Sequence, residues 1–222
     1  MDIKKQKRKM IAIFKYPSFF KHIMTSEDVF TGGCGIVFVR RKKVIKIRIK
    51  KREEAIKYEM KKRGFLTVAT LDEEKNKFET FNNRRKCSLE NNVLTMPRIE
   101  GVRLEEYIDT ENFFHYFALS IETLMKYNLY HGDFHPGNIL LNGNNVYFID
   151  FEYKYTDVLK NIELEADILK FIFYVKRYYG DFYMRNIKHF KMIFDYFEKE
   201  NLIYARNIMK CYLKDEINEI FK

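Results

Sequence analysis

Residues 131–151 read HGDFHPGNILLNGNNVYFIDF and constrain the fold more than any other stretch of the chain. Two short apolar runs, ILL and VYFI, flank NGNN, whose residue types tolerate the positive φ angles of a tight turn. The pattern predicts a β-hairpin with Asn138 just before its first strand and Asp150 just after its second. Both side chains then lie at the open end of the hairpin, and Asp133 lies in the loop that leads into it.

These three side chains offer oxygen atoms that could bind a metal ion. Mg²⁺ typically takes one or two carboxylates from a protein and completes its shell with phosphate oxygens and water. A surface hairpin whose polar residues face water has the same local pattern. The rest of the sequence must therefore distinguish a metal–nucleotide site from a solvated turn.

The chain before this hairpin has a strand-rich texture. Residues 36–39 (IVFV) and 44–49 (VIKIRI) flank the basic turn RRKK, which predicts another hairpin. Residues 52–64 predict a helix that ends at Gly64. The segments 65–71, 77–81 and 92–99 are strand-like, and the polar segments between them, 72–77 and 82–92, are typical of turns or loops.

The chain after Gly101 is mainly helical. Residues 105–128 carry apolar side chains at helical spacing, and further helices are expected at 163–179, 183–199 and 202–221. The pattern predicts the α+β class in one domain of two lobes that share a cleft. We expect a basic extension over 1–28, a small sheet lobe with one helix over 29–99 and a reduced helical lobe over 100–222.

The spacing H-x-D-x-x-x-x-N, followed by an apolar hairpin and D-F, resembles the catalytic and metal-binding loops of the protein-kinase-like superfamily. HGDFHPGNIL has the form seen in its small branches: aminoglycoside and choline phosphotransferases, lipopolysaccharide core kinases and small atypical protein kinases. The resemblance implies a two-lobed kinase-like fold with ATP and Mg²⁺ as cofactors. It also implies that Asp133 accepts the proton of the attacking hydroxyl, that Asn138 and Asp150 hold Mg²⁺, and that His131 supports the loop.

The sheet lobe contains the residue types that such a kinase needs around the nucleotide phosphates. TGGCGIV places Gly32, Gly33 and Gly35 between two extended segments, where backbone amides can approach a phosphate. This cluster departs from the fuller G-x-G-x-x-G pattern, and an ordinary hairpin turn would have the same glycines. By the resemblance, Lys46 contacts the α and β phosphates, and Arg48, on the same face of the strand, is the alternative.

A helix glutamate should orient Lys46, and the helix at 52–64 offers Glu53, Glu54 and Glu59. We expect Glu54 to take this role, with Glu59 as the next candidate. Each of the three could instead pair with a lysine one turn away on the helix surface.

The connector NVLTMPRIEG resembles a kinase hinge. By that resemblance Met96 is the gatekeeper, and the backbone of Pro97 and Ile99 meets the adenine edge, although Met96 could equally fill the core. Asp167 is either a buried acid that caps the catalytic loop or a charge at a helix N-terminus.

The residues directly after the hairpin bear on the acceptor. Phe151 and Glu152 stand where protein kinases have Phe-Gly, and no A-P-E motif comes after them. Small-molecule and glycan kinases, and the smallest atypical protein kinases, do without an activation segment with that motif. From the resemblance to lipopolysaccharide core kinases we expect a core sugar as acceptor, a heptose or Kdo. A minimal atypical serine/threonine protein kinase, like the one of the tRNA-threonylcarbamoylation machinery, is the alternative. A nucleotide-binding pseudokinase or scaffold is a further alternative, disfavoured by the intact Lys46, Asp133, Asn138 and Asp150.

Charge and cysteine content bear on partners and location. With 41 basic and 31 acidic residues the net charge is +10, which favours phosphate-bearing partners, although no nucleic-acid-binding motif is present. The three cysteines form no disulfide or zinc pattern, and no apolar run could span a membrane, so a cytoplasmic location is expected. The N-terminal KKQKRK run could be a frayed tail or a peripheral anchor on the anionic inner membrane face.

Overall fold

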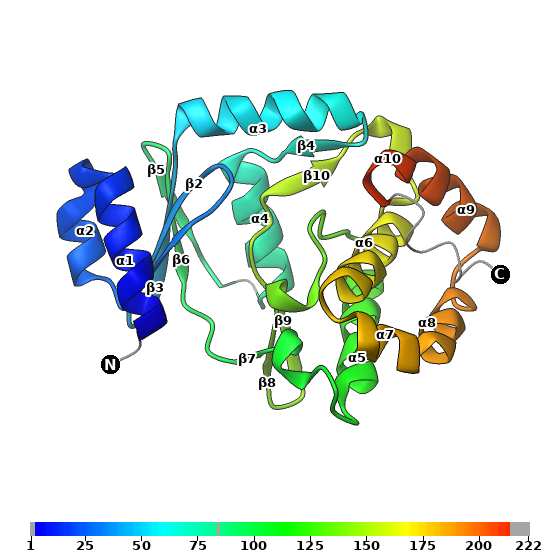
Figure 1. Ribbon diagram of the computed structural model, residues 1–222. Coiled ribbons are helices and arrows are strands. Elements are labelled where there is room, and N and C mark those ends of the chain that lie inside the picture. Colours follow the sequence, from blue (N-terminus) through cyan, green and yellow to red (C-terminus); the bar gives the residue numbers. More distant parts are fainter. Residues whose placement is uncertain (1–2, 84, 214–222) are drawn as a thin grey trace. The chain divides into compact units, whose positions relative to one another are not determined.

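The computed structural model describes residues 3–83 and 85–213, except the side chain of residue 211. The chain divides into two compact units, one made of residues 1–59 and 70–99 and the other of residues 60–69 and 100–222. Unit 1 contains a small antiparallel sheet with helices, and unit 2 is mainly helical (Figure 1). The α+β class and the combination of a sheet lobe with a helical lobe are therefore confirmed.

Unit 1 is built on a five-stranded antiparallel sheet with the order β1-β2-β3-β6-β5. Its strands are β1 (Asp28–Thr31), β2 (Gly35–Val39), β3 (Lys43–Arg48), β5 (Ser88–Glu90) and β6 (Val93–Pro97). The predicted hairpin around RRKK is confirmed, because β2 and β3 pair with Val39 opposite Val44. The strand β5 lies in a segment that the sequence indicated as a loop.

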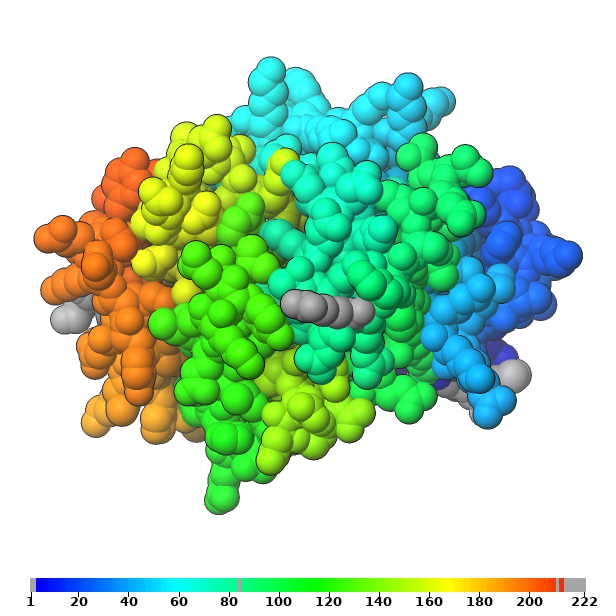
Figure 2. All heavy atoms as spheres, turned by 180° about the vertical axis from the view of Figure 1, so that it is seen from behind, coloured from blue at the N-terminus to red at the C-terminus, as the bar shows by residue number. Residues whose placement is uncertain are grey.

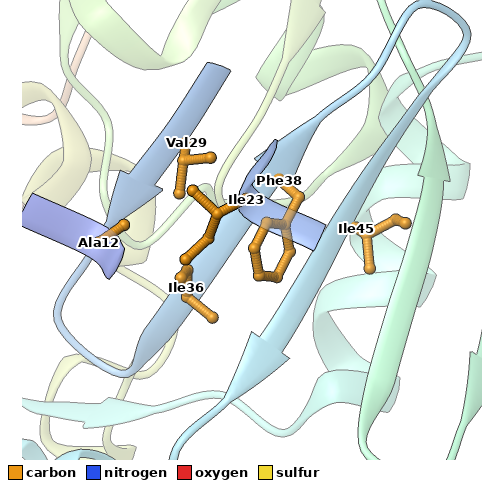
Figure 3. Packing of buried hydrophobic residues seen from close by; sticks show 6 residues of the cluster. All are labelled: Ala12, Ile23, Val29, Ile36, Phe38 and Ile45. Carbon is orange, nitrogen blue, oxygen red and sulfur yellow. The ribbon is translucent and has the colours of Figure 1, made fainter. Parts of the chain in front are cut away.

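The two faces of this sheet have different coverings. On one face, α1 (Ile3–Lys15) and α2 (Phe20–Thr25) enclose an apolar cluster that includes Phe38 and Ile45 (Figure 3). The cluster consists of Ala12, Ile23, Val29, Ile36, Phe38 and Ile45. Because side chains alternate along a strand, Lys46 points to the opposite face. Residues 3–15 therefore form a helix packed on the sheet, and not a frayed tail.

The helix α3 (Lys50–Arg63) follows β3, and the helix α4 (Leu71–Phe81) precedes β5. The predicted end of α3 is confirmed, since Gly64 follows it with a φ of +79°. The strand expected at 77–81 is wrong, because that segment is the last part of α4. The helix starts with a capping box between Thr70 and Glu73 and buries apolar side chains at helical spacing, and this overrides the local alternation of KFETF.

Unit 2 carries most of the helices. They are α5 (Phe113–Tyr127), α6 (Glu163–Tyr178), α7 (Gly180–Arg185), α8 (Ile187–Phe194), α9 (Lys199–Ile208) and α10 (Lys210–Leu213). The single helix expected at 183–199 is divided, because α7 ends at Arg185 and α8 at Phe194. In the space-filling view the orange part of the chain adjoins the green part (Figure 2). Phe114 of α5 contacts Phe190 of α8. The part of the last expected helix beyond residue 213 lies outside the described residues.

Two small sheets position the loops of unit 2. One has the order β7-β8-β9, with β7 (Val102–Arg103), β8 (Ile139–Asn142) and β9 (Asn145–Phe148). The other pairs β4 (Leu66–Val68) with β10 (Tyr153–Tyr155). Short 3₁₀ helices occupy Pro17–Phe19, Leu104–Tyr107, Pro136–Asn138 and Asp157–Leu159. The predicted hairpin is confirmed, with Ile139 opposite Phe148.

Crossing a bilayer would take a longer and more apolar helix than any that the described residues form.

Candidate functional site

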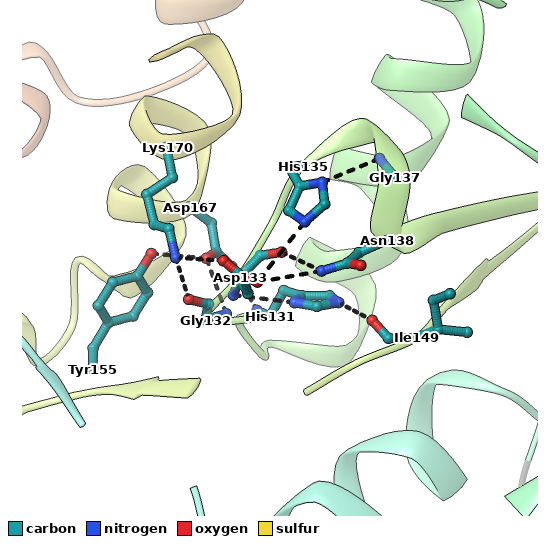
Figure 4. Close-up of polar contacts among 10 residues, drawn as sticks. All are labelled: His131, Gly132, Asp133, His135, Gly137, Asn138, Ile149, Tyr155, Asp167 and Lys170. Atoms are coloured by element: carbon teal, nitrogen blue, oxygen red, sulfur yellow. Dashed lines mark hydrogen bonds and ion pairs between the residues drawn. The ribbon is translucent and has the colours of Figure 1, made fainter. Parts of the chain in front are cut away.

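The loop that carries Asp133 is fixed by α6 through a buried carboxylate. Asp167 is fully buried and accepts hydrogen bonds from the backbone N–H groups of His131 and Gly132, the latter at 3.0 Å (Figure 4). The hydroxyl of Tyr155 donates to the same carboxylate at 2.9 Å. The interpretation of Asp167 as the acid that caps this loop is therefore confirmed.

The loop also depends on a glycine and a histidine. Gly132 has a φ of +90°, and a Cβ atom there would lie 2.1 Å from the carbonyl oxygen of Tyr153. The Nδ1 atom of His131 accepts a hydrogen bond from the backbone N–H of Asp133 at 3.2 Å. The ring proton is therefore on Nε2, which donates to the carbonyl oxygen of Ile149 at 3.0 Å. Both nitrogens of His131 are thus occupied by the backbone, in agreement with a supporting role.

The two carboxylate oxygens of Asp133 face different groups. Its Oδ1 lies 3.0 Å from the Nζ atom of Lys170, which also donates to the Gly132 carbonyl at 2.6 Å. Its Oδ2 lies 3.4 Å from the Nδ2 atom of Asn138, which also donates to the backbone oxygen of Asp133 at 3.0 Å. The amide nitrogen of Asn138 is therefore used for the loop, and its oxygen is the atom that could bind a metal.

The charges around Asp133 keep it ionised. Burial raises the pKa of this carboxyl, but the charge of the Lys170 ammonium is the largest opposing cause, and the pKa lies below its ordinary value. Burial lowers the pKa of Lys170, but the Asp133 charge outweighs this, and the ammonium persists. Burial also lowers the pKa of His135 in spite of the nearby Asp133, so this imidazole is uncharged at neutral pH.

Asp150 follows the hairpin, as predicted. The backbone N–H of Ile149 donates to the carbonyl oxygen of Asn138 at 3.0 Å, which ties the two ends of the hairpin together. Asp150 itself is exposed and has a φ of +62°, a left-handed conformation that costs little for an aspartate and turns the chain out of β9. The structure therefore places Asn138 and Asp150 at the same end of the hairpin.

The oxygen groups of Asn138 and Asp150 fit a Mg²⁺ ion that takes its other ligands from phosphates and water. In the part of the chain that the structure describes, no three His, Cys, Asp or Glu side chains gather as a metal site. A metal held by Asn138 and Asp150 would take phosphate oxygens and water as its other ligands.

Unit 1 contains a second buried ion pair, at the predicted strand lysine. Lys46 is 3% exposed, and its Nζ atom lies 2.7 Å from the Oε1 atom of Glu74 in α4. Arg48, on the same face of β3, reaches the other oxygen of Glu74 at 3.2 Å. Glu74 is itself buried, so the pair fixes the position of the lysine on the sheet face.

The expectation that Glu54 orients Lys46 is corrected by this pair. Glu54 is exposed on α3, as is Glu59. Glu53 instead pairs with Lys57, four residues on, at 2.6 Å and lies 3.6 Å from Arg48. The sequence did carry a signal for Glu74: Thr70-x-x-Glu73 is a capping box, and Glu74 then shares a helix face with Leu71 and Phe78. The interpretation of residues 72–77 as a turn did not include this helix face.

The other nucleotide-site candidates all lie in unit 1. Gly32 and Gly33 form the turn between β1 and β2, and Gly35 opens β2 so close to β3 that a Cβ atom would lie 2.1 Å from the Ile47 carbonyl. Met96 is buried in β6 opposite Val44, on the sheet face of Lys46. Pro97 ends β6, and Ile99 is buried where unit 1 ends.

Comparison with known proteins gives a limited match. No model of a known protein family matches the chain. A probable bifunctional tRNA threonylcarbamoyladenosine biosynthesis protein from Methanobrevibacter smithii is 26% identical over 121 residues, 54% of this chain. The match spans 20% of that relative's length. The name of this relative concerns tRNA modification and gives no support to a lipopolysaccharide acceptor.

Proposed function

We propose that the chain is an ATP- and Mg²⁺-dependent phosphotransferase that phosphorylates a hydroxyl group. The arrangement around Asp133 carries this proposal: an ionised carboxylate with one oxygen toward the amide of Asn138 and the other toward Lys170. Such a carboxylate can accept a proton from a hydroxyl at one side while a phosphate group is held at the other.

Each of these residues has a different role in the proposed reaction. The acceptor oxygen bonds to the γ-phosphorus, the bond from that phosphorus to the β–γ bridging oxygen breaks, the proton passes to Asp133, and ADP leaves with the bond's electrons. Mg²⁺, held by Asn138 and Asp150, would neutralise the charge that develops on the phosphates. Lys46, fixed by Glu74, binds the α and β phosphates, and the turn of Gly32, Gly33 and Gly35 covers them.

The adenine would meet the end of unit 1. In this proposal Met96 lies behind the base, and the backbone of Pro97 and Ile99 meets its polar edge. Burial of Met96 on the sheet face of Lys46 supports this placement.

The metal assignment is tested by Asp150→Asn. The full chain should be stabilised thermally by ATP with Mg²⁺, and Asp150→Asn should lose that stabilisation while Asp195→Asn, at an exposed aspartate directly after α8, keeps it. An unchanged shift for Asp150→Asn would remove this residue from the metal site.

Two acceptor classes are proposed. The resemblance of HGDFHPGNIL to lipopolysaccharide core kinases favours a heptose or Kdo hydroxyl, whereas the name of the tRNA threonylcarbamoyladenosine relative favours the minimal protein kinase of that machinery. Labelled-phosphate transfer from ATP, offered to core-truncated lipopolysaccharide and to generic protein side by side, separates them. Label in protein alone excludes the sugar, and the absence of any turnover with intact ATP binding supports a scaffold.

A peripheral contact with the cytoplasmic, anionic face of the membrane is part of the proposal. Ile3, Met10 and Phe14 are 78%, 60% and 83% exposed, and at 100° per residue they share one stripe of α1. Buried Ala12 lies on the opposite side, and Lys7 lies beside the stripe. Co-sedimentation with vesicles rich in phosphatidylglycerol should exceed that with neutral vesicles, and Phe14→Ser should reduce it; equal sedimentation with both would contradict the contact.

A further inference from the structure

His135 has one ring nitrogen that the fold uses and one that it leaves as an unused donor. Its Nδ1 atom accepts the backbone N–H of Gly137 at 3.2 Å, which caps the short 3₁₀ helix Pro136–Asn138 (Figure 4). An accepting Nδ1 places the ring proton on Nε2. The Oδ2 atom of Asp133, which this nitrogen faces, is 3.8 Å away and beyond hydrogen-bond distance. Among the residues that the structure describes, the Nε2 N–H of His135 therefore has no hydrogen-bond acceptor.

The imidazole ring of His135 is held in place before any substrate binds. It stacks on the ring of Tyr174 in α6, with ring centres 4.5 Å apart and an angle of 12° between the planes. The backbone of Gly137 approaches so closely that a Cβ atom there would lie 3.0 Å from the Cε1 atom of His135. A donor whose orientation is already fixed loses little freedom on binding, so its hydrogen bond can act fully on the reacting group.

The N–H of His135 lies beside the carboxylate at which the proposed reaction takes place. The same Oδ2 atom of Asp133 lies 3.4 Å from the Nδ2 atom of Asn138 and 3.8 Å from the Nε2 atom of His135. Asp133 and His135 both line a cavity of about 290 Å³ within unit 2, so a small group can reach them. In the proposed reaction the attacking oxygen lies about 2.7 Å from Asp133 and about 3–3.5 Å from the γ-phosphorus. A non-bridging oxygen of the phosphoryl group can then reach the N–H of His135.

The hydrogen bonds of His135 exclude it as the base and leave it as a donor. Its Nδ1 atom is occupied by the Gly137 N–H and its Nε2 atom carries the proton, so neither nitrogen can take a proton from a hydroxyl. Burial lowers the pKa of His135 in spite of the nearby Asp133, which agrees with a neutral ring at neutral pH. A phosphate oxygen that comes close to the Asp133 carboxylate is repelled by it, and an N–H donor beside that carboxylate offsets the repulsion.

We propose that His135 is a further catalytic residue, whose Nε2 N–H donates a hydrogen bond to a non-bridging oxygen of the transferring phosphoryl group. The inference rests on the proposed phosphotransferase function. While the acceptor oxygen bonds to phosphorus and the bond to the β–γ bridging oxygen breaks, the hydroxyl proton passes to Asp133 and His135 keeps its own proton. The hydrogen bond forms as the phosphoryl group moves toward Asp133, so it acts on the transfer step and not on the binding of the nucleotide.

Two substitutions separate the donor from the cap. His135→Asn keeps an oxygen that can accept the Gly137 N–H, as asparagine does at helix N-caps, but it has no atom at the position of Nε2. His135→Gln places an amide N–H near the position of Nε2 and has no acceptor at the position of Nδ1. If His135 only supported the fold, His135→Gln would be the more impaired variant. As a donor to the phosphoryl group, His135 should be replaced better by Gln than by Asn.

The measurement is the thermal stabilisation of the full chain by Mg-ADP alone and by Mg-ADP with aluminium fluoride, which stands for the transferring phosphoryl group. We expect the unchanged chain to bind Mg-ADP more tightly when aluminium fluoride is present. His135→Asn should leave the affinity for Mg-ADP alone unchanged. It should weaken the affinity for Mg-ADP with aluminium fluoride about ten- to a hundredfold, as expected for one lost hydrogen bond to a charged group. His135→Gln should lose less.

His115→Asn is the matched control, because His115 is an exposed histidine of α5 that does not line the cavity. It should leave both affinities unchanged. The proposal is overturned if His135→Asn binds the aluminium fluoride complex as tightly as the unchanged chain, if it loses affinity for Mg-ADP alone, if His135→Gln loses more than His135→Asn, or if His115→Asn loses as much.

The failure of this proposal differs from the failure of the proposed function. If Mg-ADP stabilises the unchanged chain and aluminium fluoride adds nothing, the role of His135 is overturned while nucleotide binding stands. If neither Mg-ADP nor Mg-ATP stabilises the unchanged chain, the phosphotransferase function is overturned, and the role of His135 with it.

Discussion

The two units each bury a lysine against a carboxylate, and the two pairs differ in how far the carboxylate is shielded. Lys46 and Glu74 in unit 1 have side-chain exposures of 4% and 1%. Lys170 and Asp133 in unit 2 have 4% and 26%. The lysines are equally buried, so the difference lies in the acid. Glu74 is on the buried face of α4, and Asp133 remains open to a cavity.

This difference assigns different tasks to similar pairs. A carboxylate that is buried against two cations, as Glu74 is against Lys46 and Arg48, holds those cations in position and has no access to a substrate. A carboxylate that keeps a quarter of its surface can still accept a proton. In the proposed function, the first pair fixes the lysine that would bind ATP, and the second contains the carboxylate that would accept the proton.

The largest expected effect comes from removing the carboxylate of Asp133, which is open to the cavity. Asp133→Ala should lower phosphate transfer by about a hundred- to ten-thousandfold, the usual contribution of a general base, while ATP-dependent thermal stabilisation persists. Asp133→Asn, which keeps the shape beside Lys170, should behave alike. Transfer at the original rate in either variant would remove Asp133 as the base.

Removing the buried carboxylate of Glu74 should instead lower the free energy of unfolding. Glu74→Ala leaves Lys46 and Arg48 buried without this partner, and breaking such a pair costs about 3–5 kcal/mol in the free energy of unfolding. The measurement is urea denaturation followed by circular dichroism. A loss below about 1 kcal/mol would mean that the pair is not maintained in solution.

An intermediate effect is expected from Lys170→Met, through the pH dependence of transfer. Burial would then raise the pKa of Asp133 without the opposing ammonium, so the acid limb of the rate profile should move to higher pH. In the unchanged chain the lowered pKa keeps Asp133 ionised until the pH falls below its ordinary range. Lys170→Arg retains the charge and should restore the limb; an unmoved limb in Lys170→Met contradicts the coupling.

The smallest effect should come from the glutamate that the sequence favoured. Glu54→Ala on the exposed face of α3 should change the free energy of unfolding by less than about 0.5 kcal/mol and leave ATP binding intact. Measured beside Glu74→Ala, it compares the two candidate partners of Lys46 directly. Equal losses in both variants would return Glu54 to the site.

Local pattern predicted the hairpins well because their cause is local. The alternation of VIKIRI fixes which side chains of β3 share a face, and NGNN fixes the turn between β8 and β9. The positions of Asn138 and Asp150 at one end of the hairpin follow from this register. The error at 77–81 has a local cause too, since KFETF alternates like a strand while its capping box lies seven residues earlier.

The sequence by itself determined the hairpin, the loop carrying Asp133, the strand lysine and the glycine turn, because each depends on neighbours within a few residues. Only the tertiary structure decided the partners of the two lysines. Glu74 lies 28 residues from Lys46, and Lys170 lies 37 residues from Asp133. Over such separations several carboxylates or lysines satisfy the same pattern, and the packing of α4 on its sheet and of α6 on its loop selects the one that can be buried with its charge neutralised.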